Sequence, residues 1–370
     1  MSVGLQEIIQ ACGKEFRHKY RHKLTTQHLK ALNAIEKCRT GELGRVTYQC
    51  GKCDASQFAY SSCGNRHCPL CQGSKTLDWV KNQEKKRLPV LYYLMTFTIP
   101  SELRPLFIHL QKKVYSLMFK VSSDIMKEMM ANPDNLGCDQ VGFTSILHTW
   151  GAQLQYHPHI HILFPAGGIC DDGTWKGFKP GFGLSAAKAS ELWLGKMLSG
   201  LEEISGRKNL PSQIASKKFV VDCKEVGSGA SATKYLARYV FRVAIDNRRI
   251  DKLEDGNVHF RYKDRQDDCK VKPMDLPATE FIRRFMMHVL PSGFMKVRHY
   301  GFHHPNSGID IVKLRIAIMN FSAELLDLIK KPEQETESDY VYEPPKCKAC
   351  GEDMVCVEVD RDYSRRQSTA

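Results

Sequence analysis

Three histidines at alternate positions most constrain how this chain can fold. They stand as His157, His159 and His161 in the segment QYHPHIHILFPAGG (155–168), and an apolar run follows them directly. Successive side chains of a β-strand point to opposite faces, so a strand here places all three imidazoles on one face. A polar face on an edge strand is the simplest explanation, but protonated imidazoles at this spacing repel one another, and metal ions commonly bind such clusters. The segment therefore predicts a strand that contributes to a metal site.

A third ligand can come from the segment just before this strand. The strand-like VGFTSILHTW (141–150) carries His148, and the short connection GAQLQY joins it to the histidine strand. Strands joined so closely form a hairpin, which brings His148 beside His159 and His161. Three protein ligands with open positions are typical of catalytic metal sites. Zinc is the default for three histidines, whereas a nuclease could hold Mg2+ or Mn2+ there, together with water and phosphate oxygens.

Cysteine pairs in the N-terminal part have the spacing of zinc knuckles. Cys50-x2-Cys53 and Cys68-x2-Cys71 supply four thiolates, which suits one tetrahedral zinc. The candidates for a second zinc site are Cys38, Cys63 and His67, with His22 or His28 as the fourth ligand. The tail carries another pair, Cys347 and Cys350, followed by Cys356, and for these both a zinc site and an unliganded tail stay open.

The charge balance indicates the class of partner. Lys and Arg number 54 against 41 Asp and Glu, which gives a net charge of +13 and a pI near 9.0. That balance favours a polyanionic partner, either nucleic acid or an acidic membrane surface. The first residues do not resemble a signal peptide, and the longest apolar run, LPVLYYLMTFTIP (88–100), is too short to span a bilayer. We therefore expect a soluble, cytoplasmic protein whose 14 cysteines are metal ligands and core residues rather than disulfides.

Strand-like and helix-like patterns alternate between residues 88 and 330. The expected strands are 91–100, 141–150, 157–167, 217–225 and 257–264, and the expected helices are 106–130, 185–204, 231–245 and 279–290. In the first strand, Thr96 and Thr98 share one face and suit a place beside the histidine strand. Residues 331–345 are acidic and contain prolines, which indicates a linker.

Two tyrosines lie one helical turn apart in the segment SATKYLARYVFRVAI. Tyr235 and Tyr239 are at positions i and i+4, so they share one face of the expected helix. They can be half-buried residues of an amphipathic helix. Beside a metal site in a basic protein, however, a phenol can also attack a phosphodiester and hold the product as a phosphotyrosine. The candidate DNA contacts are Lys234, Arg238 and Arg242 in this segment, and Arg283 and Arg284 further on.

Taken in order, these motifs resemble the HUH endonucleases, which are named for the pattern histidine, hydrophobic residue, histidine, here His159-Ile160-His161. More narrowly, the chain resembles the two-tyrosine rolling-circle transposases of bacterial insertion sequences, the IS91 family. Four segments carry this resemblance: CGKC with SSCGNRHCPLCQG, HTWGAQLQYHPHIHILFPAGG, KYLARYVFRVAIDNRRI and EFIRRFMMHVLPSGFMKVRHYGF. It implies an α+β fold in which a small cysteine-rich zinc-binding domain precedes an HUH palm, an antiparallel sheet with helices on one face. The implied division is a zinc-binding domain at 1–85, an HUH nuclease/transposase domain at 86–330, and an acidic linker with a Cys-containing tail at 331–370.

The resemblance also implies roles for residues. His159 and His161 match the motif pair, and His148 matches the third ligand, as a histidine does in the related conjugative relaxases. Tyr235 and Tyr239 match the two nucleophiles. Three roles stay open for His157: support of the ligands, a contact with DNA, or an alternative third ligand.

The implied activity is nicking and rejoining of single-stranded DNA, at element ends and target, through a 5′-phosphotyrosine intermediate. Mg2+ or Mn2+ is expected at the histidines and Zn2+ in the N-terminal domain. No membrane partner is expected, and both a monomer and a homo-oligomer stay open. The alternatives are a plasmid rolling-circle replication initiator or relaxase, and, in another class, a non-catalytic zinc-containing DNA-binding regulator.

Overall fold

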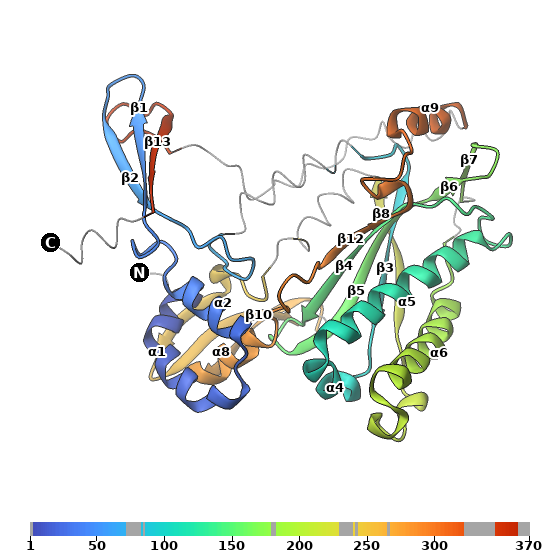
Figure 1. The fold of residues 1–370 in the computed structure, drawn as a ribbon, viewed down its shortest axis with the longest axis horizontal. Coiled ribbons are helices and arrows are strands. Elements are labelled where there is room, and N and C mark those ends of the chain that lie inside the picture. Colours follow the sequence, from blue (N-terminus) through green and yellow to red (C-terminus); the bar gives the residue numbers. More distant parts are fainter. Residues whose placement is uncertain are drawn as a thin grey trace.

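The fold is organised around one antiparallel sheet (Figure 1). In a computed structural model of the protein, the described residues are 3–71, 83, 86–178, 183–228, 240, 243–264, 267–321 and 345–361. The sheet has five strands in the order β12-β4-β5-β3-β8, and every neighbouring pair is antiparallel. The strands are β3 (Leu91–Thr98), β4 (Phe143–Trp150), β5 (Tyr156–Pro165), β8 (Val221–Ser228) and β12 (Val297–Tyr300). The strands expected at 91–100, 141–150, 157–167 and 217–225 are confirmed.

Helices cover one face of this sheet. They are α4 (Arg104–His109), α5 (Gln111–Ala131) and α6 (Ala186–Ser205), and Figure 1 shows α5 and α6 running beside the strands. Alternate residues of β3, such as Met95 and Phe97, are buried against them in the largest core cluster, which also contains Trp193 of α6. The indole of Trp193 donates to the carbonyl oxygen of Thr98 at 2.7 Å and fixes α6 on β3. The helix expected over 106–130 is broken at Leu110, where φ is −114° and ψ is 28°.

The opposite face of the sheet carries a smaller apolar cluster and the three predicted histidine ligands. The cluster contains Leu94, Ile146 and Leu163 from the sheet and Leu314 and Ile318 from a late helix. The elements at this end are α9 (Ile311–Phe321) and the two-stranded sheet of β6 (Gly167–Ile169) and β7 (Trp175–Gly177). The polar histidines therefore continue a face whose other half is closed by packing.

The first two helices pack on a second sheet rather than on the first. They are α1 (Leu5–Tyr20) and α2 (Thr26–Glu36), and the second sheet has the order β11-β10-β9. The strands of this sheet are β9 (Ile250–Glu254), β10 (Asn257–Asp264) and β11 (Lys270–Pro277). The helix α8 (Ala278–Met286) follows β11 directly. Leu5, Phe16 and Leu32 share one buried cluster with Phe260 and Phe281, so the N-terminal helices and α8 form a common core. The helix expected over 279–290 is confirmed up to residue 286.

A third sheet joins the two ends of the chain. Its order is β13-β1-β2, with β1 (Arg45–Cys50), β2 (Ser56–Tyr60) and β13 (Met354–Asp360). In Figure 1 it stands apart from the other two sheets, with the blue β1 and β2 beside the red β13. The tail thus returns to the N-terminal part and supplies its edge strand.

Short 3-10 helices complete the described structure, at Arg21–Lys23, Ser101–Leu103, Arg207–Asn209, Ile214–Ser216, Asn247–Arg249 and Gly301–His303. Among the described helices, none combines the length and the apolar character that crossing a bilayer needs. Of the helix expected over 231–245, only Val240 and residues 243–245 are described.

Candidate active site and metal centres

Strand register assembles the histidine cluster. His148 of β4 lies directly opposite His159 of β5, and His161 follows two positions along the same strand. Gly151 closes the intervening turn by donating its backbone N–H to the carbonyl oxygen of Gln155 at 3.0 Å. The candidate ligand atoms of His148, His159 and His161 all lie within 4.8 Å of one another. The hairpin expected from the sequence is confirmed, and it brings these three side chains together.

Hydrogen bonds fix two of the rings. Nδ1 of His159 donates to the carbonyl oxygen of His157 at 2.7 Å, which leaves the Nε2 lone pair of His159 as its acceptor site. Nδ1 of His161 lies 2.9 Å from the hydroxyl of Thr96, which stands opposite it on β3. His148 and His161 are buried, whereas His159 is half-buried. Rings held in this way by a carbonyl and a hydroxyl are typical of metal-binding histidines, because the partner fixes both tautomer and orientation.

His157 stands outside the cluster, although it shares the strand face. Its Nδ1 accepts from the guanidinium of Arg104 at 3.3 Å, and its ring lies 5.2 Å from that of His159. The geometry therefore favours His148 over His157 as the third member.

The donor set fits a divalent cation. Three neutral imidazoles add no negative charge, so a bound ion keeps its full charge for an anionic ligand in the remaining positions. His148 stacks on Trp150, with ring centroids 4.8 Å apart, and its ring is nearly perpendicular to those of His159 and His161. This packing holds the three rings close together before any ion binds.

Of the other predicted site residues, the structure describes only some. Tyr235, Tyr239, Lys234, Arg238 and Arg242 lie outside the described residues. Arg283 and Arg284 are on α8, where both guanidinium groups pair with Glu280, at 2.6 Å and 2.9 Å. These two ion pairs hold the pKa of Glu280 down, at about 2. Arg284 also donates to the carbonyl oxygen of Gln153 at 3.3 Å, so it ties α8 to the β4–β5 turn.

Four cysteines form a first thiol cluster in the N-terminal part. Cys38, Cys63, Cys68 and Cys71 have their sulfur atoms within 4.8 Å of one another. Cys38 follows α2, Cys63 follows β2, and the last two lie in the next turn, where the backbone N–H of Cys71 donates to the carbonyl oxygen of Cys68 at 3.1 Å. The cluster borders the core that α1 and α2 share with α8. Four thiols at this spacing fit one tetrahedral zinc.

The expected grouping of Cys50, Cys53, Cys68 and Cys71 around one zinc is wrong. Cys50 and Cys53 are at the tip of the β1–β2 hairpin, whereas Cys68 and Cys71 follow its open end. A hairpin arm of five residues separates the two pairs by about 17 Å. Cys50 and Cys53 instead lie beside Cys347 and Cys350 of the tail. Sequence reasoning missed this grouping, although the two Cys-x2-Cys spacings match.

His67 is not part of either thiol cluster, which corrects the second expected site. Cys38 and Cys63 are together as expected, but Cys68 and Cys71 complete their set. Nε2 of His67 accepts the backbone N–H of Leu290 at 3.4 Å, and burial lowers the pKa of this imidazole to about 3. The other expected ligands, His28 and His22, are also absent from the set. Nδ1 of His28 accepts the backbone N–H of Thr25, the N-cap residue of α2, and His22 is exposed in a 3-10 helix.

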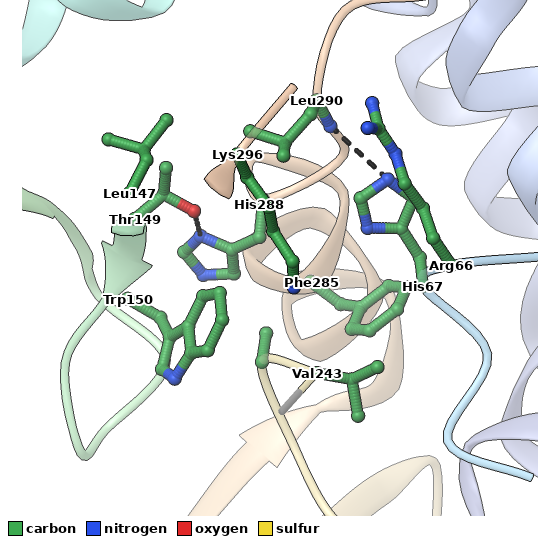
Figure 2. A pocket seen from close by; sticks show the side chains of 11 residues that line it. Arg66, His67, Leu147, Thr149, Trp150, Val243, Phe285, His288, Leu290 and Lys296 are labelled. Atoms are coloured by element: carbon green, nitrogen blue, oxygen red, sulfur yellow. Dashed lines mark hydrogen bonds between the residues drawn. The ribbon is translucent and has the colours of Figure 1, made fainter. Parts of the chain in front are cut away.

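A cavity marks the joint between the zinc-binding part and the central sheet (Figure 2). Arg66 donates to the carbonyl oxygens of Phe294 and Pro291, at 2.6 Å and 2.9 Å, and so fastens the cysteine-rich loop to the segment before β12. Burial lowers the pKa of Lys296, which lines the cavity, to about 8. Burial also lowers the pKa of His288, whose Nδ1 lies 3.3 Å from the Thr149 hydroxyl, to about 4.

None of the three clustered histidines lines this cavity, although Trp150 does and its ring also stacks on that of His148. Leu147 and Thr149, which line it, alternate with His148 along β4, so they lie on the other face of the strand. We assign the cavity to the joint rather than to the metal centre.

Comparison with known proteins identifies two family regions. A family model described as "Putative transposase" matches residues 142–308, which include His148, His159 and His161. A second model, described as "Transposase zinc-binding domain", matches residues 8–99, which include the first thiol cluster. No solved structure matches the chain with significance.

Two curated relatives carry transposase names. The "Putative transposase y4qJ" of Sinorhizobium fredii is 34% identical over 316 residues, which are 80% of this chain and 79% of the relative. The "Transposase for insertion sequence element IS801" of Pseudomonas savastanoi pv. phaseolicola is 25% identical over 284 residues, 72% of this chain and 67% of the relative. With the zinc-binding region at its N-terminal end and the transposase region over the histidine sheet, the chain belongs to the IS91-family transposases.

Proposed function

We propose that this transposase nicks and rejoins single-stranded DNA at the ends of its element and at the target, by rolling-circle transposition through a 5′-phosphotyrosine intermediate. One observation carries the proposal. Three imidazoles, from His148, His159 and His161, converge within 4.8 Å on the sheet face opposite α5 and α6. This is the histidine arrangement that the HUH resemblance requires, and it suits a metal ion that contacts a phosphate.

The three histidines would hold Mg2+ or Mn2+. When bound, the ion supplies a Lewis acid that neutralises charge on the scissile phosphate. The protein's own part is to keep the Nε2 atoms of His159 and His161 directed to the cluster, through the carbonyl oxygen of His157 and the hydroxyl of Thr96. Because both contacts come from the central sheet, the ligand geometry is held by backbone pairing rather than by a mobile loop.

Tyr235 and Tyr239 are the proposed nucleophiles. The phenolic oxygen forms a bond to phosphorus while the bond to the 3′-oxygen breaks, and the freed 3′-oxygen takes up a proton. The phosphodiester energy is kept in the tyrosine ester, so the reverse attack by a 3′-hydroxyl joins strands without ATP. The position of Val240, which follows Tyr239 directly, supports this role. Val240 is buried in one cluster with Ile146 and Leu163. Ile146 is two residues from His148 on β4, and Leu163 is two residues from His161 on β5.

The charge of the chain supports a nucleic-acid substrate. A net charge of +13 predicts that affinity for single-stranded DNA falls as the salt concentration rises. The logarithm of the binding constant should fall with the logarithm of the salt concentration, with a slope of about −0.7 per neutralised phosphate. Lys234, Arg238 and Arg242 are the proposed contacts beside the tyrosines. Contacts by Arg283 and Arg284 would compete with their ion pairs to Glu280.

The two alternatives predict different outcomes. A replication initiator or relaxase would share the cleavage chemistry, but it would act at a replication or transfer origin, and membership of a transposase family argues against it. A zinc-containing DNA-binding regulator would bind DNA without cutting it, and it would leave the histidine cluster without a role.

Covalent capture tests the proposal. Full-length protein is incubated with Mn2+ and labelled single-stranded oligonucleotides that carry the element ends, and the adduct is digested to map the attached residue. We expect a DNA-linked peptide that contains Tyr235 or Tyr239, and no adduct after the double change to Phe. Tyr262→Phe, in β10, is the matched control and should retain full adduct formation. Binding without an adduct would favour the regulator.

A further inference from the structure

The two ends of the chain meet at a second thiol cluster. Cys50 and Cys53, at the tip of the β1–β2 hairpin, lie with Cys347 and Cys350 of the tail, and their four sulfur atoms are within 4.8 Å of one another. β13 pairs along the whole of β1, with Cys50 opposite Met354. The side-chain amide of Gln57 donates to the carbonyl oxygen of Lys346 at 2.7 Å, so the tail is also held from β2.

The two cysteine pairs have the same backbone conformation. In the first pair, the backbone N–H of Asp54 donates to the carbonyl oxygen of Cys50 at 3.1 Å, and in the second that of Gly351 donates to Cys347 at 2.8 Å. Both Asp54 and Gly351 follow the second cysteine of their pair, and their φ values are +54° and +76°. Asp tolerates this left-handed conformation and Gly prefers it.

A second backbone contact repeats in both turns. The N–H of Cys50 donates to the carbonyl oxygen of Ala55 at 2.9 Å, and the N–H of Cys347 donates to that of Glu352 at 2.8 Å. Such turns leave both thiols of a pair on one side, which is the conformation of a zinc knuckle. Two matching knuckles that face each other make a four-thiol site.

The sulfur spacing distinguishes a metal site from a pair of disulfides. The sulfur atoms of Cys50 and Cys350 are 3.5 Å apart, as are those of Cys53 and Cys347. Tetrahedral zinc with Zn–S bonds of about 2.3 Å places its sulfur ligands about 3.8 Å apart, whereas a disulfide needs about 2.05 Å. The observed separation is close to the first value. In the first thiol cluster, the sulfur atom of Cys71 lies at similar distances from those of Cys38 and Cys63, 3.5 Å and 3.6 Å.

Among the described residues, the small sheet has only a small core. Its buried cluster consists of Cys50, Cys347 and Met354, with Tyr48 and Ala55 partly buried against them. Val355, Val357 and Val359 of β13 are between 54% and 64% exposed. Three buried side chains cannot offset the backbone entropy of three strands, so the sheet needs another source of stability.

We propose that Cys50, Cys53, Cys347 and Cys350 bind a structural zinc ion that fastens the C-terminal strand to the N-terminal hairpin. The protein would then hold two zinc ions, one in each thiol cluster. The binding free energy of the second ion folds the three-stranded sheet, and the tail is therefore part of the zinc-binding region. This inference is independent of the chemistry at the histidine cluster.

Alkylation of the full-length wild-type protein tests it with internal controls. Cys53 and Cys350 are exposed, as are Cys269 and Cys356, which belong to neither cluster. We expect iodoacetamide to modify Cys53 and Cys350 at least about tenfold more slowly than Cys269 and Cys356, because a zinc-bound thiolate is a poor nucleophile. A chelator should abolish this difference. Equal rates before chelation would overturn the proposal, and so would protection that only a reductant removes, which indicates disulfides.

Zinc content provides the second measurement. The double variant C347S/C350S should hold one zinc ion per chain fewer than the wild type, and the control Cys356→Ser should hold as many as the wild type. Hydrogen exchange at the amides of β1 should become faster in the double variant, while β4 and β5 stay protected. A double variant with the zinc content of the wild type would contradict the site.

Discussion

The hydroxyl of Thr96 lies 2.9 Å from Nδ1 of His161, across the pairing of β3 with β5. Thr96→Val keeps the shape of this side chain and removes the hydroxyl. We expect affinity for Mn2+ to fall by about 10–100-fold, because the ring loses the partner that orients it. Calorimetric titration with Mn2+ measures this directly, and cleavage by the variant should recover at high Mn2+. Thr96→Ser keeps the hydroxyl and is the control. Unchanged Mn2+ affinity in the Val variant would show that the contact does not position His161.

The histidine cluster predicts a separation of cleavage from DNA binding. Changing His148, His159 or His161 to Ala should slow cleavage by at least about 100-fold, because the Lewis acid is lost. The basic surface is untouched, so affinity for single-stranded DNA should stay within about threefold. Cleavage is followed on a labelled oligonucleotide and binding by fluorescence anisotropy.

His157→Ala is the matched control for these variants, since His157 shares the strand face but lies outside the cluster. Its effect should be milder and should not depend on the concentration of Mn2+. Efficient cleavage after thorough chelation would argue against a metal at this site.

Burial of His288 predicts a pH dependence of stability. Its pKa falls from an ordinary 6.5 to about 4 in the folded protein. Between these values the unfolded chain binds a proton that the folded chain does not. The stabilisation that neutral, buried His288 provides is therefore complete above pH 6.5, and it is lost as the pH falls toward 4. The loss amounts to about 3 kcal/mol at most.

His288→Gln removes this titration and keeps a polar group beside Thr149 and the carbonyl oxygen of Leu154. Urea unfolding between pH 7 and pH 4.5, in excess zinc, should show a smaller decrease in stability for the variant than for the wild type. Zinc loss at low pH affects both proteins and cancels in the difference. Parallel curves would mean that the pKa of His288 is not lowered in the folded protein.

The sequence was sufficient to predict the histidine hairpin, because local rules determine it. Alternation fixes the face of each strand, a short connection fixes their pairing, and together they place His148 opposite His159. The same alternation places Thr96 and Thr98 on one face of their strand, and their expected place beside the histidine strand is confirmed, since β3 pairs with β5.

The thiol sites could be predicted only in part. Cys-x2-Cys spacing indicates a knuckle, but it does not determine which knuckles share an ion, since that depends on what the intervening residues fold into. Here they form a hairpin that carries Cys50 away from Cys68, and the partner Cys350 stands 300 residues further along the chain. The pairing of Arg284 with Glu280, in contrast, is a local i,i+4 contact on α8, of the kind that the sequence can indicate.

The two tyrosines carry the central mechanistic prediction. In the helix that the sequence predicts for residues 231–245, Tyr235 and Tyr239 lie one turn apart on one face, so either can present its hydroxyl to the same phosphate but not both at once. Two nucleophiles allow one cleaved end to be held while a second strand is attacked. Phenylalanine keeps the ring and removes only the hydroxyl. We therefore expect the double Phe variant to lose all covalent attachment to DNA while it folds normally.

The single variants separate two nucleophiles from one. Each should retain some cleavage in vitro, because the remaining tyrosine can still react, and each should fail or nearly fail at complete transposition, because strand exchange needs both. Adduct formation on labelled oligonucleotides and transposition frequency in cells measure the two steps independently. If Tyr235→Phe or Tyr239→Phe transposes at the wild-type frequency, that tyrosine only packs and the scheme reduces to one nucleophile. If the double variant still forms an adduct, another residue attacks the phosphate, and peptide mapping of that adduct identifies it.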